Sequence, residues 1–116
     1  MKIKEITEEK ITFDNGTTIT YGHERDCCEY NYADFKQVRN EDIFDDLFDH
    51  DFPEKLQVQP VKNFGFRFGS PLLWIPVPCY SEQNGCYSTH LSIITKFPDC
   101  QYVLHLEEEV QEVLFD

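Results

Sequence analysis

The sequence predicts an α+β fold: a single domain over residues 1–116, mainly antiparallel β-sheet built from hairpins, with one short acidic amphipathic helix. Three patterns support this prediction. They are a hairpin signal near the N-terminus, a strand of alternating phenylalanines, and an acidic segment whose apolar residues follow helical spacing. Short connections favour antiparallel pairing. A chain of 116 residues can bury enough apolar surface to fold without disulfides or metal.

The first hairpin is predicted by two segments of β-branched and aromatic residues, 10–13 and 18–21, that flank Asn15-Gly16. Asn-Gly is the strongest short hairpin signal, because the two-residue turn that it favours needs positive φ at both positions. We expect residues 2–6 to add a strand or a turn before this hairpin.

A third strand is expected over residues 24–32. Alternate side chains of a strand point to opposite faces. One face would carry His23, Arg25, Cys27 and Glu29, and the other Glu24, Asp26, Cys28, Tyr30 and Tyr32.

A short helix is predicted over residues 40–51, with Asn40 as the N-cap and acidic residues in the first turn. Pro53 would end it. The apolar face would consist of Ile43, Phe44, Leu47 and Phe48, and the acidic face of Asp45, Asp46 and Asp49.

The second half of the chain predicts further strands. Phe64, Phe66 and Phe68 alternate with small or polar residues, as in a half-buried strand. Residues 72–79 are apolar, but Pro76 and Pro78 cannot donate to a ladder, which favours an edge strand or an extended segment. We expect a turn over 81–85, a strand over 86–97 that Pro98-Asp99 ends, and a strand over 101–106. The tail, residues 106–115, fits either a helix or a strand.

The charge is strongly acidic, with 22 Asp and Glu against 10 Lys and Arg, a formal net charge of −12. Such a chain repels phosphate backbones and anionic membranes, so we expect no direct nucleic-acid or membrane binding. A basic protein is the partner that this charge favours, although solubility alone would also explain it. No apolar run approaches the length of a membrane span, and the first residues contain no secretory leader pattern, so we expect a cytoplasmic protein of undetermined oligomeric state.

Five cysteines are an odd number, which argues against a complete disulfide framework. Zinc sites usually use Cys-x2-4-Cys pairs, and none is present. A non-local metal site formed by His23, Cys27 and Cys86 remains the alternative interpretation. The main prediction is that no cofactor is bound, and that Cys27 and Cys28 are small buried residues.

Enzymatic chemistry is not indicated, because no nucleotide-binding, hydrolase-elbow or local Cys-His motif is present. A cysteine or paired-carboxylate hydrolase is the weaker alternative. We therefore assign no catalytic residue. The candidate interaction residues are Asp26, Cys27, Cys28, Glu29, Asp45, Asp46 and Asp49. Aromatic residues beside turns or prolines, which suit either an interface or a core, are Tyr30, Tyr32, Trp74, Tyr80 and Tyr87.

The stretch from Thr18 to Glu29 contains His23 followed by Asp26-Cys27-Cys28-Glu29. It resembles the His-x-x-Asp-Cys-Cys-Glu signature of a family of small uncharacterised proteins from bacteria and their phages. An acidic helix (residues 42–47) and a hairpin motif (residues 81–88) are similar to later motifs of that family. Cys86 replaces an aromatic residue of that hairpin motif, and the resemblance covers roughly residues 10–95. It implies a phage or mobile-element setting and no catalytic residue.

The charge, the absence of catalytic motifs and the resemblance together predict a non-enzymatic accessory or interaction protein. Its acidic face would bind a basic surface of a partner protein.

Overall fold

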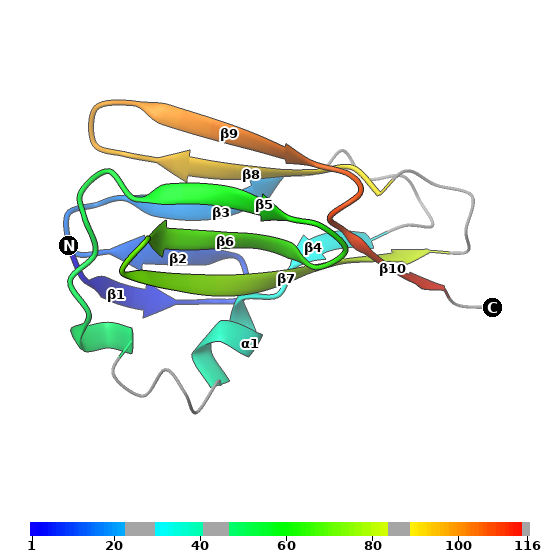
Figure 1. Cartoon of the computed structure of the whole chain (residues 1–116), viewed down its shortest axis with the longest axis horizontal. Helices are drawn as coiled ribbons and strands as arrows, with labels where there is room; N and C mark the ends of the chain where they lie inside the picture. Colours follow the sequence, from blue (N-terminus) through cyan, green and yellow to red (C-terminus); the bar gives the residue numbers. More distant parts are fainter. Residues whose placement is uncertain (23–29, 41–46, 84–88, 115–116) are drawn as a thin grey trace.

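The computed structural model is a sandwich of two five-stranded sheets, and it describes residues 1–22, 30–40, 47–83 and 89–114 (Figure 1). The fold is α+β and dominated by antiparallel sheet, as the sequence predicts. None of the helices in these described ranges is long and apolar enough to cross a membrane.

The first sheet has the strand order β1-β2-β3-β8-β9, and every neighbouring pair is antiparallel. It confirms the predicted strand at 101–106 and the N-terminal hairpin, and it shows that residues 3–6, expected as a strand or a turn, form a strand. Its strands are β1 (Ile3–Ile6), β2 (Lys10–Phe13), β3 (Thr18–Gly22), β8 (Leu91–Lys96) and β9 (Gln101–Leu106).

The second sheet has the order β10-β7-β6-β5, and β4 also pairs with β7. The pairs are antiparallel except β10 with β7, which is parallel. Its strands are β4 (Tyr30–Ala33), β5 (Gln57–Val61), β6 (Gly65–Ser70), β7 (Leu73–Gln83) and β10 (Gln111–Leu114). Within the tail that the sequence left open between helix and strand, Gln111–Leu114 is therefore a strand.

The core lies between the sheets and is built from the inward positions of alternating strands. Phe13 of the first sheet meets Phe68 of the second edge to face, with ring centroids 6.2 Å apart. Phe52, from the connection before β5, packs on both rings. The strand of alternating phenylalanines is confirmed for Phe66 and Phe68, which are completely buried, whereas Phe64 lies in the turn before β6.

The turn of the first hairpin differs from the predicted two-residue type. Only Gly16 has a positive φ, 93°, while Asn15 does not. The amide of Gly16 donates to the Phe13 carbonyl, and the Phe13 amide donates to the Thr17 carbonyl. This is a three-residue loop with a glycine bulge, and the Asn15 side chain accepts from the Thr17 amide.

The predicted helix over 40–51 is wrong at the residues that the structure describes, 40 and 47–51. Helix α1 spans Phe35–Asn40, so Asn40 ends a helix instead of capping one. Its cap is Asp34, whose carboxylate accepts from the Gln37 amide. Residues 41–46 lie outside the described ranges, and Leu47–Asp49 forms a single 3-10 turn, η2. Within η2 Leu47 is buried but Phe48 is 43% exposed, so Phe48 is not part of an apolar face.

Strand β7 is longer and more central than predicted. Residues 79–83 pair with β4 and β10, so the turn expected to begin at 81 is strand as far as Gln83. Residues 84–88 lie outside the described ranges. The strand expected from 86 is described only from Thr89 onward, and β8 begins at Leu91. The break at Pro98-Asp99 is confirmed as the β8–β9 turn, where the Phe97 amide donates to the Cys100 carbonyl.

Candidate functional site: an acidic groove lined by tyrosines

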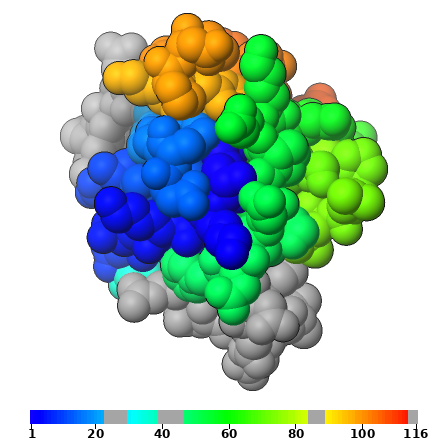
Figure 2. Space-filling view, turned by 90° about the vertical axis from the view of Figure 1, so that its left-hand side faces the viewer, coloured from blue at the N-terminus to red at the C-terminus, as the bar shows by residue number. Residues whose placement is uncertain are grey.

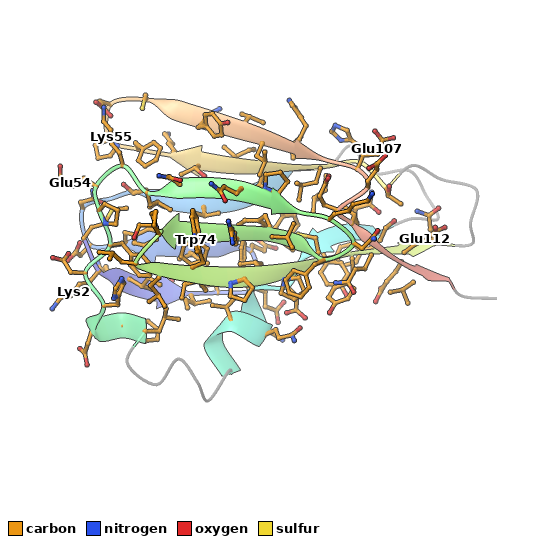
Figure 3. All side chains as sticks on the ribbon, viewed as in Figure 1. Lys2, Glu54, Lys55, Trp74, Glu107 and Glu112 are labelled. Atoms are coloured by element: carbon orange, nitrogen blue, oxygen red, sulfur yellow. The ribbon has the colours of Figure 1, made fainter. Side chains whose placement is uncertain are left out.

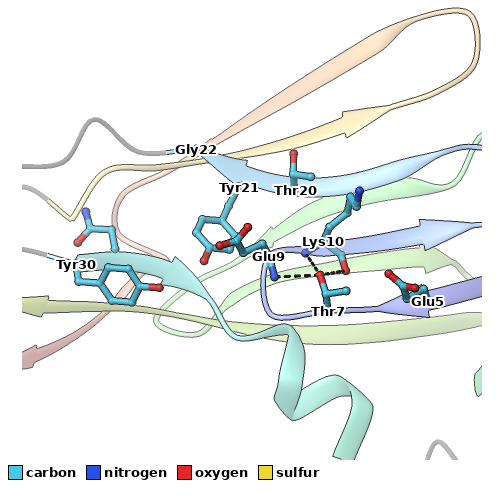
Figure 4. Close-up of a pocket in the computed structure, with 9 residues that line it drawn as sticks. Glu5, Thr7, Glu9, Lys10, Thr20, Tyr21, Gly22 and Tyr30 are labelled. Atoms are coloured by element: carbon cyan, nitrogen blue, oxygen red, sulfur yellow. Dashed lines mark hydrogen bonds between the residues drawn. The ribbon is translucent and has the colours of Figure 1, made fainter.

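An open groove runs past the ends of β1, β2 and β3 toward β4 and α1. Two adjoining hollows of about 730 and 240 Å³ form it, and they share Glu9, Tyr21 and Tyr30 (Figure 4). The larger hollow is lined by Glu5, Thr7, Glu9, Lys10, Thr20, Tyr21, Gly22, Tyr30 and Asn31. The smaller is lined by Glu8, Glu9, Tyr21, Tyr30, Tyr32, Ala33, Asp34 and Lys36.

The turn between β1 and β2 presents the first acidic wall. Thr7 closes this turn, since its amide donates to the Lys10 carbonyl at 2.8 Å and its hydroxyl accepts from the amides of Glu9 and Lys10 (Figure 4). These bonds are typical of a turn held by a Thr side chain. They fix the backbone from which Glu8 and Glu9 project into solvent.

Three tyrosines form the aromatic wall. Tyr30 and Tyr32 are stacked, with ring centroids 4.7 Å apart, because they occupy alternate positions of β4. Tyr21 comes from β3 and packs on buried Phe35 of α1. Burial raises the pKa of Tyr21, and its hydrogen bond with Tyr30 and the carboxylates of Glu9 and Glu8 add to the shift.

Tyr32 is held by a carboxylate from the neighbouring strand. Its hydroxyl donates to Glu82 Oε1 at 3.2 Å. Burial, the charge of Glu82 and this hydrogen bond raise the pKa of Tyr32 to about 12. The phenol therefore stays neutral at physiological pH, and the ring keeps a fixed place beside the groove.

The groove carries more negative than positive charge. Its acidic lining residues are Glu5, Glu8, Glu9 and Asp34, against two lysines, Lys10 and Lys36. Lys36 is paired with Glu8 across the groove. Both side chains of this pair are largely exposed, so the pair is screened and contributes little to stability.

A buried polar cluster fixes β4 beneath the groove. Asn31 Nδ2 donates to the His90 carbonyl at 2.9 Å, and the Ser81 hydroxyl donates to Asn31 Oδ1. Gln83 Nε2 in turn donates to Ser81 at 2.6 Å. Asn31, Ser81 and Gln83 are at most 3% exposed. Buried polar groups that satisfy one another hold a unique geometry, so this cluster positions the strand that carries Tyr30 and Tyr32.

Most of the site residues predicted from the sequence lie outside the described ranges. This applies to Asp26, Cys27, Cys28, Glu29, Asp45 and Asp46, and to the alternative metal ligands His23, Cys27 and Cys86. Asp49 is described and is an exposed residue of η2 that does not line the groove. Within the described part of the chain, no three His, Cys, Asp or Glu side chains are close enough to hold a metal ion.

The structure separates the aromatic residues that the sequence grouped together. Tyr30 and Tyr32 line the groove, and the Tyr80 ring continues the row with its centroid 5.7 Å from that of Tyr32. Trp74 lies at the other end of β7, with the Arg67 guanidinium 4.2 Å above its ring. Tyr87 is outside the described ranges.

Sequence reasoning missed Tyr21, the β1–β2 turn and Asp34 as parts of one site. Local signals in the sequence do indicate the β1–β2 turn and the position of Asp34. Thr7 followed by polar residues between two strand patterns marks a turn, and Asp34 before Phe-Lys-Gln-Val marks a helix start. No local signal brings residues 7–10 beside residues 30–36, because that contact depends on the packing of the two sheets.

The chain matches no protein-family model, no curated protein and no solved structure. The resemblance to the phage-related family therefore stays a prediction, and the groove is interpreted from its own chemistry.

Proposed function

We propose that this chain is a non-enzymatic interaction protein that binds a basic segment of a partner protein in the acidic groove. One observation carries the proposal: carboxylate residues and the tyrosines Tyr21, Tyr30 and Tyr32 line the same open groove. The phage or mobile-element setting belongs to the proposal only through the resemblance.

Lysine and arginine side chains fit such a groove in two ways. Carboxylates form charge-assisted hydrogen bonds with ammonium and guanidinium groups. Tyrosine faces attract the same cations through the ring quadrupole. The net charge of −12 would also speed the approach of a basic partner at low salt.

The first test measures peptide binding. The probe is a fluorescein-labelled peptide of alternating Arg and Ser, and the comparison peptide carries Glu in place of Arg. We expect fluorescence anisotropy to show binding of the Arg peptide only, weakened about tenfold or more between low and high salt. An affinity that does not change with salt would contradict the proposal.

The second test separates the groove from the general charge of the protein. Glu5→Gln with Glu9→Gln removes two charges from the groove. Glu54→Gln with Asp99→Asn removes two exposed charges elsewhere, one before β5 (Figure 3) and one in the β8–β9 turn. We expect the first pair to weaken Arg-peptide binding about tenfold and the second pair to have a much smaller effect. Equal effects of the two pairs would mean that the groove is not the binding site.

A further inference from the structure

A second groove lies at the β9 edge of the first sheet, the edge opposite β1, where β9 meets edge strand β5 of the second sheet. Its volume is about 400 Å³. Figure 2 shows the β8–β9 hairpin in orange above the green segment that leads into β5. Its apolar lining residues are Leu56, Val58, Phe97 and Tyr102.

The core of the sandwich is incompletely covered at this groove. Tyr102 is the cross-strand partner of Thr95, so both side chains lie on the core-facing side of the first sheet. Thr95 is 1% exposed, yet Tyr102 is 55% exposed. An apolar ring on the core side normally loses most of its contact with water, so the groove leaves room for a further apolar group.

Thr95 shows a second irregularity in the floor of the groove. Its hydroxyl is buried and has no hydrogen-bond partner. A buried hydroxyl without a partner is energetically unfavourable.

The charge of this groove differs from that of the acidic groove. Among the described residues that line it, Lys55 is the single charged one, in a chain with 22 acids. Lys55 lies beside the β8–β9 hairpin (Figure 3), and its charge acts on the Cys100 thiol. Two acids are near this end: Asp99 forms a hydrogen bond with Cys100, and Glu54 precedes Lys55. Neither of them lines the groove.

We propose that the β5–β9 groove binds a small molecule with an apolar body and a carboxylate head, of the medium-chain fatty acid class. The chain of the ligand lies against Val58, Phe97 and Tyr102, and its carboxylate pairs with Lys55. The volume is within the usual range of small-molecule sites. This function is independent of the acidic groove.

The test uses three probes with the same ten-carbon chain: decanoate and decylamine below their micelle concentrations, and decanol below its solubility limit. Isothermal titration calorimetry of the whole chain should show decanoate binding with a Kd below about 1 mM, and weaker binding of the other two. Absence of decanoate binding, or tighter binding of decylamine, would overturn the proposal.

Variants then place the site. Lys55→Gln should weaken the binding of decanoate about fivefold and leave the binding of decanol unchanged. Lys62 is an exposed lysine outside this groove, and Lys62→Gln should change the binding of neither probe. Val58→Glu should abolish decanoate binding. Tyr102→Ala should weaken both probes, and its exposed position makes it the safer variant if Val58→Glu does not fold. Decanoate binding that survives both Val58→Glu and Tyr102→Ala would show that it occurs elsewhere.

Discussion

At the residue scale, the glycines of β6 allow the strand to lie against β7. Gly65 has a φ of 153°, and a Cβ added there would lie 2.3 Å from the Val77 carbonyl oxygen and 2.7 Å from the Cys79 amide nitrogen. Both neighbours are backbone atoms of a central strand and cannot move independently. Glycine is therefore required at this position by conformation and by space together.

Gly65→Ala should lower the free energy of unfolding by more than about 3 kcal/mol, because strain and a backbone clash add. Urea denaturation followed by circular dichroism measures it. Gly22→Ala is the control, since the nearest atom there is Ile94 Cδ1 at 3.5 Å, an ordinary contact. Equal stability of the two variants would contradict this packing of β6 on β7.

The tyrosines of the acidic groove give stability a pH dependence at alkaline pH. Tyr32 has a folded-state pKa of about 12, above its ordinary value of 10.0. The folded state thus retains this proton more strongly than the unfolded state. The stabilisation is complete below about pH 10 and is lost as the pH rises through 12. The pKa of Tyr21 is also raised, which acts in the same direction.

Tyr32→Phe should therefore flatten the fall in unfolding free energy between about pH 10 and pH 12, the window between the unfolded-state and folded-state pKa values. Urea denaturation at several pH values measures the slope. Tyr102→Phe, on an exposed ring, is the control and should keep the wild-type slope. A Tyr32→Phe slope as steep as that of the wild type would contradict the raised pKa of Tyr32.

At the element scale, β7 shows how a strand with two prolines becomes central. Pro78 carbonyl accepts from the Asp34 amide on one edge, while the Cys79 amide donates to the Phe64 carbonyl on the other. The backbone N–H and C=O groups of successive residues in a strand point to alternate edges. The missing amides of Pro76 and Pro78 therefore lie on the edge away from β6. No strand of the described ranges pairs with residues 73–78 on that edge. The predicted edge strand over 72–79 is thus correct for 73–78, whereas Cys79 pairs on both edges. Residues 81–83, which were predicted as part of a turn, belong to the strand.

Pro76→Ala should change the free energy of unfolding by less than about 1 kcal/mol, because the new amide meets the open edge. Val77→Pro should lower the free energy of unfolding much more than Val77→Ala. Both substitutions lose packing, but only proline removes an amide that faces β6. Thermal and urea unfolding of the three variants compare these costs. A Val77→Pro protein as stable as Val77→Ala would disprove this assignment of the edges.

At the scale of the whole molecule, the net charge of −12 opposes folding through repulsion between like charges. Added salt screens this repulsion over about 10 Å at 0.1 M. The Tm should therefore rise as NaCl increases from 10 to 300 mM, because screening changes most in this range. Differential scanning calorimetry measures this rise. The rise should be smaller for Glu54→Gln with Asp99→Asn. A Tm that falls with salt would mean that attractive ion pairs outweigh the repulsion.

The sequence predicts those elements whose signals are local. The hairpin around Gly16, the phenylalanine strand, the β8–β9 break at Pro98 and the strand at 101–106 all follow from alternation and turn residues. The helix was misplaced because Leu47 and Phe48 match helical spacing, although they occupy a single turn that buries only Leu47. The hairpin loop gained a residue because Gly16 alone adopts positive φ.

The candidate site was less predictable than the fold. The acidity that favours a basic partner is a property of composition, and Tyr30 and Tyr32 were recognised as interface candidates. The joining of the β1–β2 turn to β4 and α1 was not predictable, because those segments are more than 20 residues apart.

By itself, the sequence determined the antiparallel α+β character, the acidity and most strand positions, because periodicity, turn chemistry and charge are local or additive properties. Only the tertiary structure decided that β7 is central and that the tail pairs parallel to it. It also decided that Tyr21 joins the carboxylates in one groove and that Tyr102 stays exposed on a core-facing position. These features depend on which strand edges meet when the two sheets pack, and contacts between distant segments leave no signal within a short window of sequence.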